Sequence, residues 1–295
     1  MIRPPQIALF DDGRLHLQDG PIDLFIGADG TEPDIRAAYQ TAARRFTGLL
    51  DELCSELAEL RKAADPAASA LQGVVAQRMY RAVAPYTRET FITPMAAVAG
   101  AVAEEILGAM LRVAPLRRAY VNNGGDIALH LADGATFIVG LMDRPDAQGV
   151  LRTMTIHAED SVRGVATSGR HGRSFSLGIA DAVTVLARTA AQADAAATII
   201  ANAVDLPGHP SVIRQPACEI QPDSDLGDRL VTRKVGALCE NEIVEALSAG
   251  EARAQALLAA GLIEDAVLQL CGAMRSVGAP HLDRATPPQL RAAAA

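Results

Sequence analysis

The strongest constraint on the fold is a change of hydrophobic periodicity along the chain. Apolar residues recur at helical spacing over residues 31–62, after a candidate N-cap at Thr31 and with Pro33 in the first turn. From Tyr120 to about residue 187 the pattern becomes that of short strands separated by turn residues, and helical patterns return after residue 190. Strands gathered in the middle of a chain, with helices on both sides, favour an α+β fold over a regularly alternating α/β fold.

Turn and capping residues divide the chain into expected elements. The expected helices cover 31–62, a stretch beginning at Pro94, 190–204, 242–247, 251–258 and 263–274. Strands are expected at 7–17 with a break at 11–13, and at 22–26, 127–131, 135–141, 151–157, 162–167, 182–187 and 230–235. The segment after Pro207 is expected to be a loop. Residues 1–278 are predicted to form a single domain, followed by a flexible tail over 279–295.

The core is expected to be built from small and aliphatic residues. The chain is 49% hydrophobic but only 3% aromatic, and it contains no Trp. Core volume must therefore come from Leu, Val and Ile and from close approach of backbones. The helix expected after Thr93 carries an almost continuous run of Ala and Gly over residues 96–103. Such a surface allows another backbone or a flat ligand to come very close.

Charge and hydropathy exclude several classes of protein. The chain has 27 Lys and Arg residues against 35 Asp and Glu, a net charge of −8, so we expect no nucleic-acid partner. Its longest apolar stretch, 95–103, is shorter than the roughly 20 residues of a membrane span, and the N-terminus lacks the apolar run of a signal peptide. We therefore expect a cytoplasmic protein with no membrane partner. The cysteines lack metal-site spacing and are expected to be reduced core thiols: Cys54, Cys218, Cys239 and Cys271.

Two glycine-containing motifs are candidate ligand contacts. The sequence NNGGD over 122–126 stands just before an expected strand, and its adjacent glycines can expose backbone N–H groups to a phosphate or a nucleotide edge. Taken alone, the motif is more often a tight turn. The sequence TSGR over 167–170 leaves a similar choice between a phosphate or ribose contact and a turn with a solvated arginine.

A third motif suits a metal ion. Asp194 and Thr198 are one turn apart on the helix expected over 190–204, so a carboxylate and a hydroxyl leave from one face. Oxygen donors at that spacing suit Mg²⁺. The alternative is a surface Asp beside a Thr that bonds back to its own helix. The surrounding alanines indicate a packed helix, in which a carboxylate needs a partner, and this favours the metal hypothesis.

The order of these motifs resembles the FAD:protein FMN transferases, the ApbE-like superfamily. Residues 93–204 contain an Ala-rich helix start, NxGGD before a strand, A-T-S-G, a V-T-V strand and A-D-x-x-x-T on a helix. The chain looks most similar to a short, cytoplasmic and poorly characterised branch, in which ITPMAAVAGAVAEE, YVNNGGDIALHL and QADAAATIIANA are typical stretches. The resemblance implies an ApbE-like α+β fold of mainly antiparallel sheets with packed helices.

The resemblance also implies a site. FAD or another nucleotide diphosphate would bind through Mg²⁺, which would be held by the backbone carbonyl of Ala99 and by Asp194 and Thr198. The ligand would lie along Asn123, Gly124, Gly125, Asp126, Thr167, Ser168 and Gly169. The implied reaction transfers FMN to a Thr or Ser hydroxyl of an acceptor protein and releases AMP.

The chain departs from the family pattern at two places. Gly100 stands where the family has Lys, and the shorter segment 174–181 replaces the family's H-x-x-D-P-x-T-G. His171 is too close to Gly169 to take the place of that histidine, and Asp181 is the candidate for the acid and for a catalytic role. Two interpretations therefore stay open: a flavin-transferase-like enzyme, and a non-enzymatic relative that acts as a small-molecule sensor or an oligomeric scaffold.

Overall fold

The computed structural model describes residues 4–65, 70–141, 152–278 and 282–283. Within these ranges the main feature is a nine-stranded antiparallel sheet in the order β1-β2-β3-β4-β5-β8-β9-β12-β13. Its strands are β1 (Gln6–Leu9), β2 (Leu15–Asp19), β3 (Ile22–Asp29), β4 (Arg118–Asn123), β5 (Asp126–Leu131), β8 (Gly164–Ser168), β9 (Ala182–Ala187), β12 (Asp265–Leu270) and β13 (Ala273–Gly278).

Two smaller antiparallel sheets accompany it. One contains β6 (Thr136–Leu141), β7 (Arg152–His157) and β14 (Leu282–Asp283), and the other pairs β10 (Val212–Pro216) with β11 (Leu230–Val235). Met154 and Ile156 of β7 pack with Val165, Leu186 and Val267 of the large sheet, so the β6–β7 sheet covers part of one face. The predicted α+β class with mainly antiparallel sheets is confirmed.

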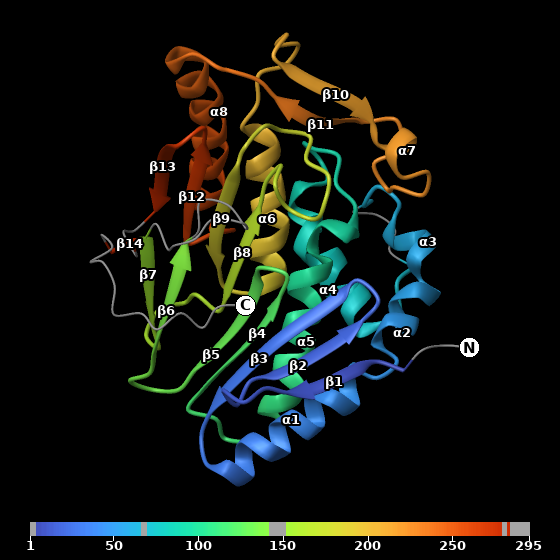
Figure 1. Ribbon diagram of the computed structural model, residues 1–295, viewed down its shortest axis with the longest axis vertical. Helices are drawn as coiled ribbons and strands as arrows, with labels where there is room; N and C mark the ends of the chain where they lie inside the picture. The colour runs from blue at the N-terminus through green and yellow to red at the C-terminus, as the bar shows by residue number, and fades with distance from the viewer. Residues whose placement is uncertain (1–3, 66–69, 142–151, 279–281, 284–295) are drawn as a thin grey trace.

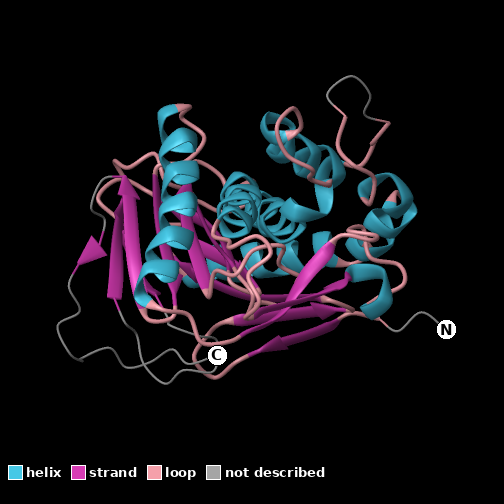
Figure 2. Cartoon of the chain, turned by 90° about the horizontal axis from the view of Figure 1, so that it is seen from above, coloured by secondary structure: helices cyan, strands magenta, loops and turns pink. Residues whose placement is uncertain are grey.

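Helices cover the other face of the large sheet (Figure 1). α1 (Glu32–Phe46) packs on α5 (Val98–Leu111), which lies against β4 and β5; α6 (Ala190–Ala203) lies against β8 and β9, and α8 (Glu240–Ala259) against β12 and β13. Figure 2, seen along α5 and α6, shows them at the centre of the molecule. The remaining helices are α2 (Leu49–Ser55), α3 (Leu57–Leu60), α4 (Val74–Val83), α7 (Ala217–Ile220) and the 3₁₀ turns η1 (Ala84–Tyr86) and η2 (Pro94–Ala97).

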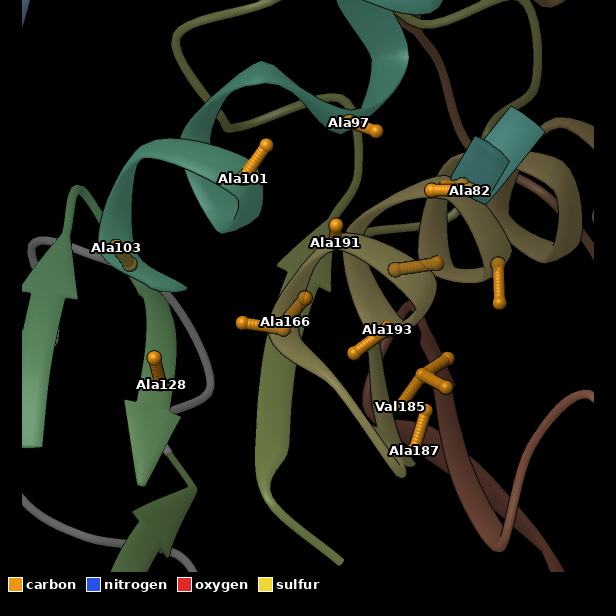
Figure 3. Packing of buried hydrophobic residues seen from close by; sticks show 14 of the residues in the cluster. Ala82, Ala97, Ala101, Ala103, Ala128, Ala166, Val185, Ala187, Ala191 and Ala193 are labelled. Carbon is orange, nitrogen blue, oxygen red and sulfur yellow. The ribbon is translucent and has the colours of Figure 1, made fainter. Parts of the chain in front are cut away.

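Small residues let α6 lie very close to its neighbours. A Cβ atom at Gly100 of α5 would be 2.3 Å from the carbonyl oxygen of Ala190, and one at Gly164 of β8 would be 2.2 Å from the carbonyl carbon of Thr189. Neither position has room for a side chain. Buried alanines fill the remaining space between the two helices and the strands beneath them (Figure 3): Ala101, Ala103, Ala128, Ala166, Ala191 and Ala193.

Two predicted helical stretches are divided differently in the structure. The single helix predicted over 31–62 is three helices, α1, α2 and α3, because the backbone leaves helical geometry at two places. Thr47 (ψ 120°) and the left-handed Gly48 (φ 83°) separate α1 from α2, and Glu56 (φ −111°, ψ 8°) separates α2 from α3. The two helices predicted over 242–258 are one, α8, which continues through Gly250. A Cβ atom at Gly250 would be 2.3 Å from Val204, so this glycine is required by packing and does not end the helix.

The helix predicted over 263–274 was wrong. This stretch is the hairpin of β12 and β13, joined by Cys271 (φ 49°) and Gly272 (φ 82°). All six residues of β12 are buried, so its apolar run does not alternate. Periodicity cannot separate such a run from a buried helix. The loop predicted after Pro207 also contains β10, which pairs with β11.

The structure also differs from two expectations drawn from the sequence, the burial of the cysteines and the length of the apolar stretch. The four cysteines are free, but their expected place in the core was wrong, because Cys54, Cys239 and Cys271 are exposed and Cys218 is partly exposed. One helical stretch, Pro94–Leu111, is longer than the expected apolar run and meets the length and hydropathy of a membrane span; 61% of it is buried inside the protein. Apart from β14, the predicted tail over 279–295 lies outside the described residues.

Candidate functional site

The two glycines of NNGGD form the hairpin turn between β4 and β5. Gly124 and Gly125 both have positive φ angles, 65° and 112°, as a two-residue hairpin turn requires. The Gly125 N–H donates to Oδ1 of Asn122 over 2.8 Å. Asn123 and Asp126 are cross-strand partners on either side of the turn. The interpretation of NNGGD as a turn is therefore confirmed. The turn also places the side chains of Asn123 and Asp126 next to each other at the ends of β4 and β5.

Asn123 and Asp194 both reach the first turn of α5. The Asn123 amide donates from Nδ2 to the carbonyl oxygen of Ala99 over 3.2 Å. The Asp194 carboxylate, on α6, accepts the backbone N–H of Gly100 at 3.0 Å. Three segments far apart in the sequence thus meet at one point, and Ala99 and Asp194 lie together as the resemblance implied.

Asp126 completes a pair of carboxylates at this point. Its Oδ1 accepts the backbone N–H of Thr167 at 3.2 Å, and its charge acts directly on Asp194. Burial raises the pKa of Asp126 to about 7. Burial, followed by the charge of Asp126, raises the pKa of Asp194 well above its ordinary value, although the N–H groups of Ala99 and Gly100 oppose the shift. Two like charges side by side in a partly buried site are costly unless a cation or a proton neutralises them.

The donor set at this point suits a hard cation. It offers two carboxylates and the carbonyl oxygen of Ala99, which accepts a hydrogen bond from Nδ2 of Asn123. Among the residues that the structure describes, neither Asp126 nor Asp194 forms an ion pair with Lys, Arg or His. No cluster of three or more His, Cys, Asp or Glu side chains suited to a metal occurs in those same ranges. A cation here would depend on the carbonyl and on ligand oxygens as well as on the two carboxylates.

The first turns of α5 and α6 hold each other through acidic side chains. Asp194 of α6 accepts an N–H in the first turn of α5, and Glu104 of α5 accepts the Ala191 N–H in the first turn of α6 at 2.7 Å. Arg78 of α4 binds Glu104 from the other side, 3.1 Å from Nε to Oε2. This reciprocal capping satisfies helix N–H groups that would otherwise be unpaired and fixes how the two helices cross.

Thr198 lies one turn beyond Asp194 on α6, as the spacing predicted, and its side chain is partly buried. Within the described part of the chain, no hydrogen bond joins its hydroxyl to Ala99 or to Asp194. Its role as a metal ligand stays a prediction.

Asp181 is held in a separate group of charges. Arg170 lies 2.5 Å and His171 3.3 Å from its Oδ1, and the Cys271 N–H donates to its Oδ2 over 2.5 Å. Both oxygens are therefore engaged, which does not favour a role as a general base.

The residues predicted at 167–169 end β8, next to the start of β9. The Thr167 side chain is exposed and shares a hydrogen bond of 2.9 Å with Thr184, while Ser168 is partly buried. Gly169 is buried and has no room for a side chain, because a Cβ atom would lie 2.4 Å from the Asp181 carbonyl oxygen. The backbone of Thr167 reaches Asp126, so this segment borders the candidate site.

Sequence reasoning missed two residues near the site, Glu104 and Arg173. The signal that could have indicated Glu104 is a carboxylate inside an otherwise apolar helix. Arg173 lies in the segment that follows TSGR and gave no local signal of its own, since an arginine in a polar loop is ordinarily solvated.

Part of the chain is similar in sequence to proteins named UPF0280. Over 129 residues it is 41% identical to the UPF0280 protein of Methanopyrus kandleri, covering 43% of this chain and 48% of that protein. Over 114 residues it is 41% identical to the UPF0280 protein of Methanothrix thermoacetophila, covering 38% and 46%. The matched regions thus span about half the length of these curated relatives.

A solved structure also aligns with most of the chain. It is the apo crystal structure of the Pseudomonas stutzeri flavinyl transferase ApbE, at 11% identity over 94% of this chain and 95% of that one, with a TM-score of 0.44. The resemblance to an uncharacterised ApbE-like branch is confirmed by the family comparison. A family model described as "AbpE bacteria" matches residues 7–276, nearly all of the chain, which therefore belongs to this ApbE-like family.

Proposed function

We propose that the protein binds a nucleotide diphosphate, with FAD as the leading candidate, together with Mg²⁺ at Asp126, Asp194 and the Ala99 carbonyl. The observation that carries the proposal is the partly buried pair of carboxylates, in which the charge of Asp126 raises the pKa of Asp194 further above the value that burial gives it. A divalent cation would neutralise the pair, and the phosphates of the ligand would supply its remaining oxygen ligands. Thr198 is the further predicted ligand on the same face of α6.

We further propose that the bound ligand serves flavin transfer in the cytoplasm. An acceptor Thr or Ser oxygen forms a bond to the phosphorus of the FMN half, the bond from that phosphorus to the bridging oxygen breaks, and AMP leaves with the electron pair. The hydroxyl proton passes to solvent, because Asp181 is engaged by Arg170 and Cys271. Bound Mg²⁺ would offset the charge on the diphosphate.

The residues of this chain contribute binding and orientation. Asp126 and Asp194 hold the cation, Asn123 fixes the Ala99 carbonyl, and the β4–β5 turn leaves backbone atoms accessible beside them. The sequence supplies few rings for stacking on an isoalloxazine, so the diphosphate is expected to provide most of the ligand's affinity.

A binding protein without transfer activity is the second candidate. Two observations favour it. Asp181 has its carboxylate oxygens engaged, and position 100 has no room for the family's Lys because a Cβ atom there would overlap the Ala190 carbonyl. In that case the same site would serve a small-molecule sensor or an oligomeric scaffold.

Ligand-dependent stabilisation tests the shared part of the two candidates. The melting temperature of the full chain should rise with FAD or ADP only when MgCl₂ is present. Asp194→Ala should abolish the Mg²⁺ dependence, whereas Asp133→Ala, which removes an exposed carboxylate in the turn after β5, should leave it unchanged. Absence of stabilisation by either nucleotide in the wild type would refute the proposal.

Release of AMP from FAD separates the two candidates. With candidate cytoplasmic acceptor proteins present, the enzyme should release AMP and leave a flavin-labelled acceptor. Binding without AMP release would identify the sensor instead.

A further inference from the structure

We propose that Arg173 binds a second phosphate of the ligand, so that the site prefers a diphosphate to a monophosphate. This inference rests on the proposed function. It assigns a ligand contact to the connection between β8 and β9, at the residue just before the segment 174–181 in which this chain departs from the family pattern.

Arg173 lies against the hairpin turn of the candidate site. A Cβ atom at Gly124 would be 3.7 Å from Nη1 of Arg173, and Gly124 itself carries no side chain to cover the guanidinium. Asn123, on one flank of the same turn, donates to the Ala99 carbonyl. Asp126, on the other flank, lies beside Asp194. The turn is therefore next to both the arginine and the carboxylate pair.

The separation between the two suits adjacent phosphates. Gly124 and Asp126 are two residues apart, which is at most about 7 Å of extended chain. A ligand with one phosphate at the cation beside Asp126 would bring a neighbouring phosphate toward Arg173. A monophosphate would reach one of these partners and leave the other without a ligand.

The guanidinium of Arg173 is available for a ligand. Its side chain is 69% exposed, and its ion pair with Oδ2 of Asp23 is long, at 3.5 Å. The other oxygen of Asp23 is held by His16 at 2.7 Å. By contrast, Arg170 is 21% exposed and lies 2.5 Å from Asp181. A planar guanidinium with free N–H groups is well suited to bind phosphate oxygens.

The negative charges of the protein and of a diphosphate ligand favour a cationic side chain next to the turn. The protein has a net charge of −8, and the site itself contributes two carboxylates. Mg²⁺ can neutralise the carboxylates, but a diphosphate brings further negative charge. An exposed arginine beside the turn would offset that charge and attract the ligand before it binds.

Calorimetric titrations of the full chain with ADP and with AMP, both in MgCl₂, test the assignment. Arg173→Gln should weaken ADP binding about tenfold or more, as expected for loss of a charge-assisted contact, and should change AMP binding by less than about twofold. Arg173→Lys should lie between the wild type and Arg173→Gln for ADP. The matched control is Arg36→Gln, which removes an arginine of similar exposure (66%) on α1 and should alter neither affinity.

Two results would overturn the assignment while leaving the proposed function intact. One is equal loss of ADP and AMP affinity in Arg173→Gln; the other is unchanged ADP affinity in that variant. If the wild type binds neither nucleotide with Mg²⁺, the proposed function fails and the role of Arg173 fails with it. Unchanged far-ultraviolet circular dichroism of the variants confirms that they are folded.

Discussion

At the scale of single residues, Asp126 and Asp194 are the groups whose chemistry is most altered by the fold. Each accepts a backbone N–H, yet the two lie beside each other in a partly buried site. Hydrogen bonds from neutral donors stabilise a carboxylate only in part, whereas the charge of the second carboxylate opposes ionisation. The pair is therefore expected to bind either a proton or a cation at neutral pH.

Asp126 should make stability depend on pH. Its pKa is raised to about 7 in the folded protein from an ordinary 3.8. Between these values the unfolded chain has lost the proton while the folded chain keeps it, so the contribution of Asp126 to stability should fall as pH rises from about 4 to about 7 without Mg²⁺. The raised pKa of Asp194 acts in the same direction. Asp126→Asn should remove this loss and be more stable than the wild type by about 2 kcal/mol at about pH 8.

Urea unfolding of both proteins at about pH 5 and about pH 8 measures the effect. The exposed Asp133→Asn serves as a control and should follow the wild type at both values. A difference between Asp126→Asn and the wild type that does not grow with pH would contradict the raised pKa.

The sequence indicated one residue of this pair as a metal ligand and did not indicate that the two would meet. Asp194 was marked by its spacing to Thr198 and by the alanines around it. Asp126 was predicted to line the ligand, as part of the NNGGD motif, and was not predicted to lie beside the metal. Whether two carboxylates repel each other depends on their distance in space, and no local pattern encodes a contact between a strand and a helix that the sequence separates so widely.

At the scale of elements, α5 and α6 form the frame of the site. Their backbones touch at Gly100 and Ala190, and each helix supplies a carboxylate to the first turn of the other. The run of small residues predicted close approach correctly. The partner helix and the crossing point could not be predicted, because many surfaces accept a small-residue face.

A matched pair of glycine substitutions on α5 tests this frame. Gly100→Ala should lower the free energy of unfolding by about 1–3 kcal/mol, because its Cβ would overlap the Ala190 carbonyl at 2.3 Å and force the helices apart. Gly108→Ala should instead be neutral or stabilising by up to about 1 kcal/mol, since alanine favours the helix and its Cβ would be 3.7 Å from Arg112.

Chemical denaturation of both variants gives the comparison. If the helix contact sets the position of Asp194, Gly100→Ala should also weaken the stabilisation by ADP and MgCl₂. Equal stability of the two variants would show that α5 and α6 are not in backbone contact in solution.

At the scale of the whole molecule, one continuous core joins the two ends of the described chain. Buried residues from Leu15 on β2 to Val277 on β13 belong to the same cluster, between the large sheet and the helices. The smaller cluster under β6 and β7 shares the strands of that sheet. Such sharing predicts that the protein unfolds as one cooperative unit.

The lack of tryptophan makes this simple to measure. Tyr39→Trp places a reporter on α1 and Phe137→Trp places one on β6, each as the sole tryptophan. The two reporters should show the same urea midpoint and the same slope, as should circular dichroism. Separate midpoints would indicate that the β6–β7 sheet unfolds independently and that the single-domain prediction for 1–278 is wrong.

The sequence by itself determined the α+β class, most strands, the glycine turn before β5 and the helix that carries Asp194. These features follow from interactions between residues close in the chain: alternation, helical spacing, capping and the left-handed freedom of glycine. Local patterns failed at β12, where burial on both faces removed alternation, and at Gly48, where a single left-handed residue divided a helix.

Only the tertiary structure decided which polar groups meet. It brought Asp126 next to Asp194 and Arg173 next to Gly124. It also placed Asp181 in contact with Arg170, His171 and the backbone of Cys271. The physical reason is that electrostatic energies depend on distance and burial, and both are set by how sheets and helices pack. Periodicity places a side chain on one face of its element; packing decides what that face meets.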